Sequence, residues 1–398
     1  MYSSKLCLMC KGSRMLCGNS SCPILAKMNL KPKIKIAEDF FGPSTSVFVG
    51  SYGYPNVNVG PMAAIQMQEN IDNPNQWYGM KYNDVVKMRS YILRSKQPEN
   101  IFSKSRLVGE VQELALASGP TEVEMNFKRA PKFNPRFSDV IQPMGPTADL
   151  NKLSITENTK IEKKVERIIR DDLLSKDASL MLYHNKQDVY KISTILSSGI
   201  LGIKKRRLVP TRWGITAVDD MIAKELLIKI RYFPEIDNFY VAESNYLDNH
   251  FIILLMPGGW EYENFEAWAP GSSWSQGATE TQIIEEYEPF KGRKKYADKE
   301  AGGYYAARLG VVEYLAKIRK QARVIVFREI SEGYVLPLGV WVVRETARNA
   351  FNNIKKFSTL NEALSHISSK LKISIKEYEK RSIILKQRRL NQFINKLK

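Results

Sequence analysis

All four cysteines of this 398-residue chain lie within its first 22 residues, at Cys7, Cys10, Cys17 and Cys22. The first two form a CxxC pair, whose thiolates hold one side of a tetrahedral ion. So short a segment builds no core of its own and needs a cross-link to fold. A disulfide pair is the alternative, but a chain with no other cysteine and no secretory signal fits a reducing compartment better. The spacing therefore predicts a structural zinc module over residues 1–27, with no open metal position for a substrate.

The charge balance predicts a polyanionic partner. Lys and Arg outnumber Asp and Glu by 60 to 42, a formal net charge of +18. The excess gathers in residues 1–37, in the run from Lys204 to Arg207 with Arg212, and in residues 370–398. Any one of these stretches alone would be an ordinary solvated face, whereas the three together favour a surface that follows phosphates. Nucleic acid is favoured over acidic membrane, and RNA stays an alternative to DNA.

The remainder of the chain has the composition of a packed protein. Hydrophobic residues make up 43% of it, enough for a core, and no stretch approaches the ~20 apolar residues of a membrane helix. Helical and strand patterns interleave without a βαβ rhythm, which predicts an α+β fold with mixed helices and mostly antiparallel strands. After the zinc module we expect an α+β region over 28–150, a second over 151–380 and a basic tail over 381–398. The protein is expected in the cytoplasm, associated with the nucleoid, without a membrane partner.

Periodicity places several elements. Helical spacing of apolar residues marks five stretches, at 84–94, 160–174, 301–320, 338–351 and 360–371. Strict alternation over residues 121–128 predicts a half-buried strand, with its inward face formed by Val123, Met125 and Phe127.

Turn residues indicate further strands. Strand formers at 239–247 and 251–256 meet at Asp248 and Asn249, which predicts a hairpin. The Gly- and Pro-rich stretch 40–62 predicts short strands joined by tight turns. Its aromatic side chains suit core packing better than stacking on bases; they are Phe48, Tyr52 and Tyr54.

Aromatic and basic side chains interleave at two places that suit a flipped or single-stranded base. One follows the central basic run, and the other opens the helix expected at 301–320. The nucleic-acid-binding candidates are Lys204, Lys205, Arg206, Arg207, Arg212, Trp213, Tyr304, Tyr305 and Arg308.

Carboxylates offer the one candidate arrangement for catalysis. The three histidines lack ligand spacing, and the chain has no GxSxG elbow. The carboxylate candidates fall in two groups, Asp219 with Asp220, and Glu261 with Glu263 and Glu266 on an aromatic-rich strand, where Glu261 and Glu263 share one face. If the two groups converge in the fold, their carboxylates would bind Mg²⁺ for phosphodiester cleavage. The favoured interpretation is that they balance the charge of nearby arginines. Whether the chain is an enzyme stays open.

The final residues, QRRLNQFINKLK, carry a spaced pattern at Gln387, Leu390, Phe393 and Ile394. Residues three apart line up on one side of a tight helical turn, so the aliphatic and aromatic side chains enter one groove. Burying them contributes about 1.5–3 kcal/mol each, enough for a micromolar anchor. The pattern resembles the peptide that docks on the DNA sliding clamp, PCNA. The alternative is the inner stripe of an ordinary terminal helix.

Longer strings resemble one protein family. They are LVPTRWGITAVDD at 208–220, PGGWEYENFEAW at 257–268, AGGYYAARLGVVEYL at 301–315, FVGSYGYPNVNVGP at 48–61 and LGVWVVRE at 338–345. In this order they resemble the archaeal Nre family of DNA repair proteins. The resemblance implies a four-cysteine zinc finger at the start and a clamp-binding peptide at the end. Ile394 departs from the more common aromatic residue there, which bears on clamp affinity.

Two hypotheses follow. One is a repair factor that binds DNA and PCNA, with other repair proteins as further partners. The other is a metal-dependent nuclease or base-processing enzyme recruited by the same tail, with Mg²⁺ as a cofactor only in the nuclease case.

Overall fold

This computed structural model describes residues 4–11, 16, 18, 36–133, 136–203 and 206–387. The chain divides into two compact units. Unit 1 takes Met1–Ser20, Leu226–Leu336 and Val342–Lys398, and unit 2 takes Ser21–Glu225 and Pro337–Trp341. The boundary expected at residue 150 does not coincide with this division, because residues 147–155 form a strand in the middle of unit 2.

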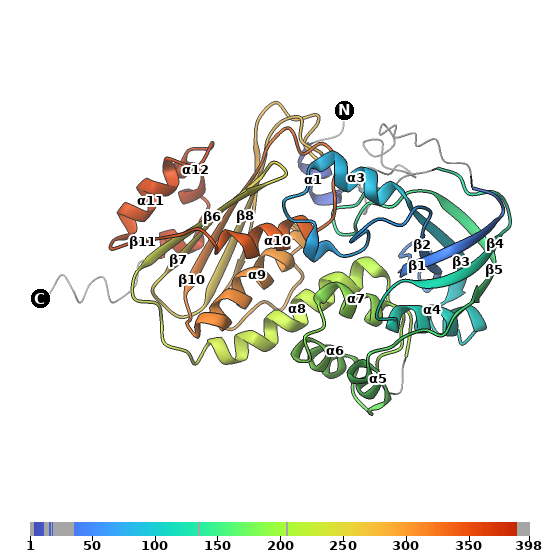
Figure 1. Cartoon of the computed structure of the whole chain (residues 1–398). Coiled ribbons are helices and arrows are strands. Elements are labelled where there is room, and N and C mark those ends of the chain that lie inside the picture. Colours follow the sequence, from blue (N-terminus) through green and yellow to red (C-terminus); the bar gives the residue numbers. More distant parts are fainter. Residues whose placement is uncertain are drawn as a thin grey trace, which may run out of the picture. The chain divides into compact units, whose positions relative to one another are not determined.

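Unit 2 is built on a closed barrel with the strand order β1-β2-β3-β5-β4 (Figure 1). β3 and β5 run parallel, and every other pair of neighbours in the barrel is antiparallel. The strands are β1 (Asp39–Val49), β2 (Asn56–Ala64), β3 (Ile92–Asn100), β4 (Thr121–Phe127) and β5 (Thr147–Ile155). The alternating strand predicted at 121–128 is confirmed, because its three inward side chains are at most 2% exposed.

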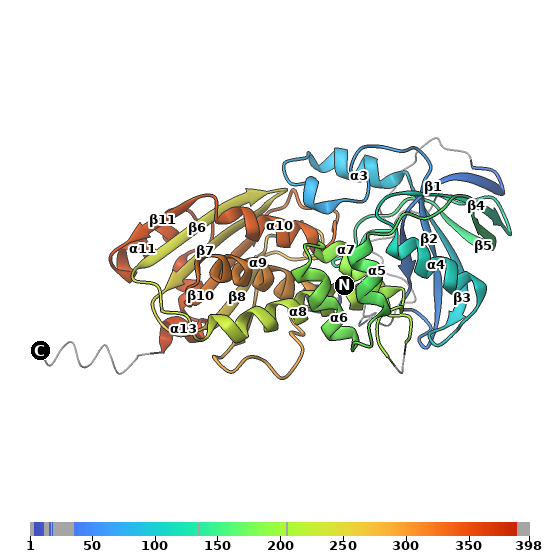
Figure 2. The same cartoon turned by 60° about the horizontal axis from the view of Figure 1, so that its bottom comes forward.

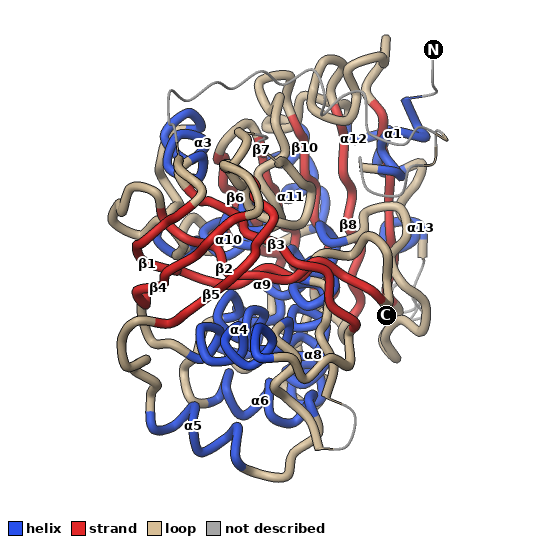
Figure 3. Tube along the Cα trace, turned by 90° about the vertical axis from the view of Figure 1, so that its right-hand side faces the viewer, coloured by secondary structure: helices blue, strands red, loops and turns tan. Residues whose placement is uncertain are grey.

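A helix fills one end of this barrel. Between β3 and β4 the chain forms α4 (Arg106–Leu116), whose apolar face joins the barrel core (Figure 3). Ser105 caps it by accepting a hydrogen bond from Val108 N at 3.3 Å. A five-stranded barrel with this strand order, and a helix between its third and fourth strands, has the topology of the OB-fold.

Other helices of unit 2 surround the barrel. The helix expected over 84–94 ends at Ser90, because Ile92 already pairs with Ala64 of β2. The chain passes into unit 1 within the last of these elements. They are η1 (Pro74–Gln76), α3 (Tyr82–Ser90), α5 (Lys163–Arg170), α6 (Ser175–His184), α7 (Val189–Ser197) and α8 (Thr211–Ile230).

Unit 1 contains a six-stranded sheet in the order β11-β6-β7-β10-β8-β9. The predicted hairpin is confirmed as β6 and β7, whose turn places Leu247 and Asp248 at φ values of 48° and 57°. β10 and β8 are parallel and the other neighbours antiparallel. The strands are β6 (Phe239–Tyr246), β7 (Asn249–Met256), β8 (Glu261–Trp268), β9 (Gln282–Glu288), β10 (Arg323–Ile330) and β11 (Ile354–Phe357).

Helices cover both faces of this sheet (Figure 2). On one face, apolar residues of the last three helices pack against β6, β7, β8 and β10. On the other lies α9, against which α10 packs where Gly310 faces Ala347. The helices of unit 1 are α1 (Ser4–Cys10), α9 (Gly302–Ile318), α10 (Trp341–Ala350), α11 (Leu360–Ser368), α12 (Ile375–Glu379) and α13 (Ile383–Lys386). The predicted α+β fold is confirmed. In the described part of the chain, no helix combines the length and apolarity needed to cross a bilayer.

Candidate functional site

The basic segment before α8 lies against the barrel of unit 2. Leu208 is 2% exposed within the barrel core, and its N–H donates to the carbonyl that follows β3 at 2.8 Å. Thr211 Oγ1 accepts from Val49 N at 2.9 Å, which fixes the first turn of α8 beside the end of β1. Arg206 and Arg207 are exposed on the same segment. Barrel contacts therefore hold these two candidate DNA-binding side chains at one rim of the barrel.

Aromatic rings from the β1–β2 loop, residues 50–55, join this rim. Tyr52 is 91% exposed and Tyr54 is 41% exposed. The Tyr54 ring lies 5.0 Å from that of Trp213, which is 46% exposed. The expectation of core packing is therefore wrong for both tyrosines, because they follow the last barrel residue of β1; it is confirmed for Phe48, which is 8% exposed. We call Tyr52, Tyr54 and Trp213 the rim aromatics.

Three other nucleic-acid candidates are buried inside unit 1. Tyr304, Tyr305 and Arg308 are 0%, 6% and 1% exposed. Arg308 pairs with Glu288 at 2.5 Å, and the Tyr304 hydroxyl donates to the same carboxylate at 2.9 Å. Tyr305 accepts from Ala297 N at 3.1 Å. These contacts fasten α9 to the sheet, so in this structure the three side chains offer no face to a base.

Glu261 and Glu263 share one face of β8, as the spacing predicts, and both face the C-terminal segment. Glu263 accepts from Ser382 Oγ and from Ile383 N, the latter at 2.7 Å. Burial raises the pKa of Glu263 even though these two hydrogen bonds oppose the shift. Glu261 pairs at 2.9 Å with Arg323, whose other guanidinium nitrogen donates to the Ile384 carbonyl. These side chains hold residues 382–384, which we call the tail root.

Glu266 lies on the opposite face of β8, in a buried charged cluster. It is 0% exposed, and its carboxylate contacts Lys11 at 3.0 Å and Arg328 at 2.6 Å. Burial alone would raise the pKa of Glu266, but the two cations outweigh it and hold that pKa below its usual range. Glu300 lies nearby, and burial together with the charge of Glu266 raises its pKa well above the usual value. The pKa values of these two buried carboxyl groups are therefore shifted in opposite directions.

The two aspartates of the carboxylate hypothesis belong to α8 in unit 2, whereas the three glutamates belong to unit 1. Asp219 is 0% exposed, and Asp220 pairs with Lys224 at 2.6 Å. Among the described residues, no three His, Cys, Asp or Glu side chains gather closely enough to hold a metal ion. Asp220, Glu261 and Glu266 therefore form ion pairs, and Glu263 accepts hydrogen bonds at the start of α13.

The cysteine module is described only in part. Cys7 and Cys10 lie on α1, one turn apart and so on one side of the helix, where two thiolates fit a shared soft metal ion. Gln387 is exposed directly after α13. The remaining predicted ligands and contacts fall outside the described residues; they are Cys17, Cys22, Lys204, Lys205, Leu390, Phe393 and Ile394.

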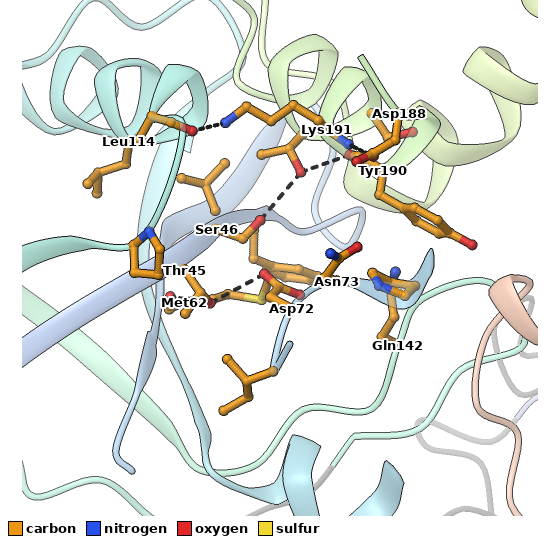
Figure 4. Close-up of a pocket in the computed structure, with 18 of the residues that line it drawn as sticks. Thr45, Ser46, Met62, Asp72, Asn73, Leu114, Gln142, Asp188, Tyr190 and Lys191 are labelled. Atoms are coloured by element: carbon orange, nitrogen blue, oxygen red, sulfur yellow. Dashed lines mark hydrogen bonds between the residues drawn. The ribbon is translucent and has the colours of Figure 1, made fainter. Parts of the chain in front are cut away.

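Unit 2 also contains a cavity of about 360 Å³ between the outer wall of β1, the loop before η1, and α7 (Figure 4). Asp72 accepts from Thr45 Oγ1 at 3.3 Å and pairs with Arg89 at 2.7 Å. Lys191 donates to the Ala117 carbonyl, and burial lowers its pKa to about 8 against the pull of nearby carboxylates. The volume suits a small polar molecule, beside an amine that loses its proton more readily than usual.

Sequence reasoning missed this cavity. Its wall comes from seven separate stretches, near residues 45–48, 62, 67–74, 114–120, 141–142, 188–194 and 211–215. No motif links them, so only the folded chain brings them together.

The OB-type barrel with its aromatic rim, joined to a layered six-stranded unit, defines a two-unit α+β protein. The chain belongs to the archaeal Nre family. The model "Archaeal Nre, N-terminal" matches residues 16–275 and "Archaeal Nre, C-terminal" matches residues 288–396. No solved structure matched the chain.

Named relatives match almost end to end. DNA repair protein NreB of Archaeoglobus fulgidus is 35% identical over 388 residues, covering 96% of this chain and 97% of the relative. DNA repair protein NreA of the same organism is 35% identical, covering 97% and 98%. NreA of Haloferax volcanii is 33% identical, covering 86% and 85%.

Proposed function

We propose that this chain is a DNA repair protein that binds DNA and is recruited by the PCNA clamp through its C-terminal peptide. The observation that carries the repair role is the family match, since relatives named DNA repair proteins align over nearly the whole chain. The net charge of +18 and the exposed rim of unit 2 support DNA binding. Such a protein would work at the nucleoid, beside other repair proteins.

The tail root supports the clamp part of the proposal. Buried Glu263 and Arg323 fix residues 382–384 to the sheet, and Ile384 is 1% exposed in the core. Ile384 therefore belongs to the fold, while Gln387, the first motif residue, is exposed beyond it. We infer that a clamp peptide starting directly after this anchored root would leave unit 1 at a fixed point.

We propose further that Cys7, Cys10, Cys17 and Cys22 hold one structural zinc ion. The ion would fold the short module over residues 1–27 and would fill all its coordination positions with thiolates.

The clamp proposal predicts that Phe393→Ala lowers clamp affinity by about 10- to 100-fold, because the main apolar anchor is removed. Titration of the full-length chain against its cognate PCNA in a calorimeter measures this. Asn391→Ala is the matched control, since it changes a free position of the same peptide. Equal affinity of the Phe393→Ala variant and the unaltered chain would reject the motif.

The DNA-binding proposal is tested with damaged, branched and single-stranded DNA in the presence of Mg²⁺, with both complex and product measured. Binding that weakens steeply with salt and leaves the DNA intact supports a repair factor. Strand scission that is lost in Glu263→Gln would instead support the nuclease.

A further inference from the structure

We propose that unit 2 binds single-stranded DNA across the outer face of β2 and β3, from the rim aromatics to the loop between β4 and β5. This inference rests on the proposed DNA-binding role and names its substrate and its site. The barrel topology locates the face, because OB barrels use the outer surface of β2 and β3 and the two adjoining loops for oligonucleotides. The fold alone does not show that a ligand binds, and the side chains on this face provide the evidence.

The rim aromatics favour an unpaired strand. Tyr52 is 91% exposed, and the tilted pair of Tyr54 and Trp213 adds two more accessible rings. Stacking of an aromatic ring on the face of a base contributes binding free energy. In a duplex each base face is covered by the neighbouring base pairs, so an unpaired strand is favoured. Arg206 and Arg207 are exposed on the adjoining segment and supply charge for phosphates.

The face is open and largely polar at its end next to the β1–β2 loop. In the register of β2 and β3, Asn56 lies opposite Asn100, and Asn58 lies opposite Pro98. Asn100 Nδ2 donates to Asn56 Oδ1 at 2.9 Å, and both residues are exposed. Short amide side chains leave a shallow surface that a chain of nucleotides can cross, with donors and acceptors for base edges.

The far end of the face is basic. The β4–β5 loop is described at residues 128–133 and 136–146, and its acidic side chain, Asp139, already pairs with Arg212 at 3.5 Å. Its four basic residues are exposed: Lys128, Arg129, Lys132 and Arg136. A phosphate backbone would neutralise this excess of positive charge.

The guanidinium of Arg94 in β3 is only partly hydrogen-bonded, with Nη2 donating to Thr147 Oγ1 at 3.1 Å. Its guanidinium lies 4.9 Å over the Phe48 ring, and among the described residues its Nε has no hydrogen-bond partner. Burial, and then the charge of Arg136, lower the pKa of Arg94 to about 10. Two neighbouring guanidinium groups are stabilised by a phosphate that accepts from both.

Strand register sets the length of the path. Arg94 pairs with Thr147, which places the β4–β5 loop at the start of β3, whereas Asn100 pairs with Asn56 next to the β1–β2 loop. Six residues of strand span about 20 Å. Such a span fits a short strand within the range of about 4–16 nucleotides that one OB barrel covers.

Trp213 provides a direct optical test. It is 46% exposed, and the other five tryptophans are at most 2% exposed. Oligothymidine of about 20 nucleotides, within the reach of one or two OB sites, is titrated into the full-length chain while tryptophan emission is recorded. We expect quenching that saturates with binding and disappears in Trp213→Phe, which keeps a stacking ring and therefore still binds by fluorescence anisotropy of a labelled strand. Saturated binding without quenching of Trp213 overturns the proposed path.

Substitutions separate this site from general DNA affinity. Tyr52→Ala should weaken single-strand binding about 5- to 100-fold, while Tyr52→Phe keeps it. Phe41→Ala is the matched control, because Phe41 is 68% exposed on the same barrel but pairs toward β4. Arg136→Glu should weaken binding and reduce the slope of log affinity against log salt by about 0.7 or more per lost phosphate contact.

The outcomes distinguish the inference from the proposed function. If the chain binds DNA but Tyr52→Ala and Arg136→Glu leave the affinity unchanged, the site is wrong and the DNA-binding role stands. Tighter binding of a duplex of equal length, or of the matching RNA strand, overturns single-stranded DNA as the substrate. If no DNA is bound at all, the DNA-binding role fails and this inference with it.

Discussion

Two buried glutamates in unit 1 show how neighbours decide the charge of one residue type. The Glu266 carboxylate pairs with Lys11 and Arg328, whereas the Glu300 carboxyl group accepts from Asn264 at 2.5 Å. Lys11 instead donates to the backbone carbonyl of Glu300 at 2.9 Å. Both carboxyl groups are fully buried, so burial alone cannot explain why their pKa values shift in opposite directions.

We therefore predict that Glu266→Gln destabilises unit 1 by about 3–5 kcal/mol, because it leaves two buried cations without their counter-charge. Glu300→Gln is the matched control and should cost less than about 1 kcal/mol, since the raised pKa of Glu300 favours its uncharged form and the amide oxygen of Gln can still accept from Asn264. Urea unfolding followed by circular dichroism measures both. Equal losses in the two variants would contradict the assignment of charge.

Among the secondary-structure elements, α13 shows how a side chain can hold a functional peptide in place. Ser382 caps this helix by accepting from Leu385 N at 3.0 Å, and its hydroxyl also donates to Glu263. The short helix has little stability of its own and depends on this cap and on the burial of Ile384.

Removing the cap in Ser382→Ala should cost about 1–2 kcal/mol of local stability and expose the tail root. Ser374→Ala is the matched control, because Ser374 precedes α12 in the same position without a side-chain cap bond. Hydrogen exchange of the α13 amides measures the change, and protection equal to that of the unaltered chain would show that the cap is dispensable.

Periodicity predicted β4, whose two faces differ strongly, and turn residues predicted the β6–β7 hairpin. It missed β3, which reads ILRSKQPEN and has partly polar inward positions, including buried Ser95, beneath an exposed polar outer face. Such a strand is specified by its partners β2 and β5 rather than by its own pattern. The rim of unit 2 was predicted only in part. Arg206, Arg207 and Trp213 stand in a recognisable run of the sequence, whereas the exposure of Tyr52 depends on where the barrel strand β1 ends.

At the scale of the whole molecule, the first segment of the chain and its last helices belong to the same unit. Lys11 follows the cysteine pair directly and is buried against Glu266 in β8. Folding of the N-terminal segment is therefore coupled to packing in the interior of unit 1 through Lys11.

Replacing Cys10 with Ser should lower the zinc content below one ion per chain and reduce the unfolding midpoint of the whole protein, because the segment before Lys11 loses its cross-link. Met9→Ser is the control, as Met9 is 39% exposed on the same helix. Elemental analysis of the purified chains measures the metal, and full retention of one zinc by the Cys10→Ser variant would reject the module.

Unit 1 is made of three separate stretches of the chain, and this sets the order in which the two units fold during synthesis. The barrel strands are contiguous from residue 39 to residue 155, so the barrel can close while the ribosome is still making the sheet of unit 1. That sheet must wait for α11, α12 and α13, which cover one of its faces and come from the last part of the chain. A nascent chain stalled near residue 330 would thus carry a finished barrel and a sheet with one apolar face uncovered, the form most in need of a chaperone.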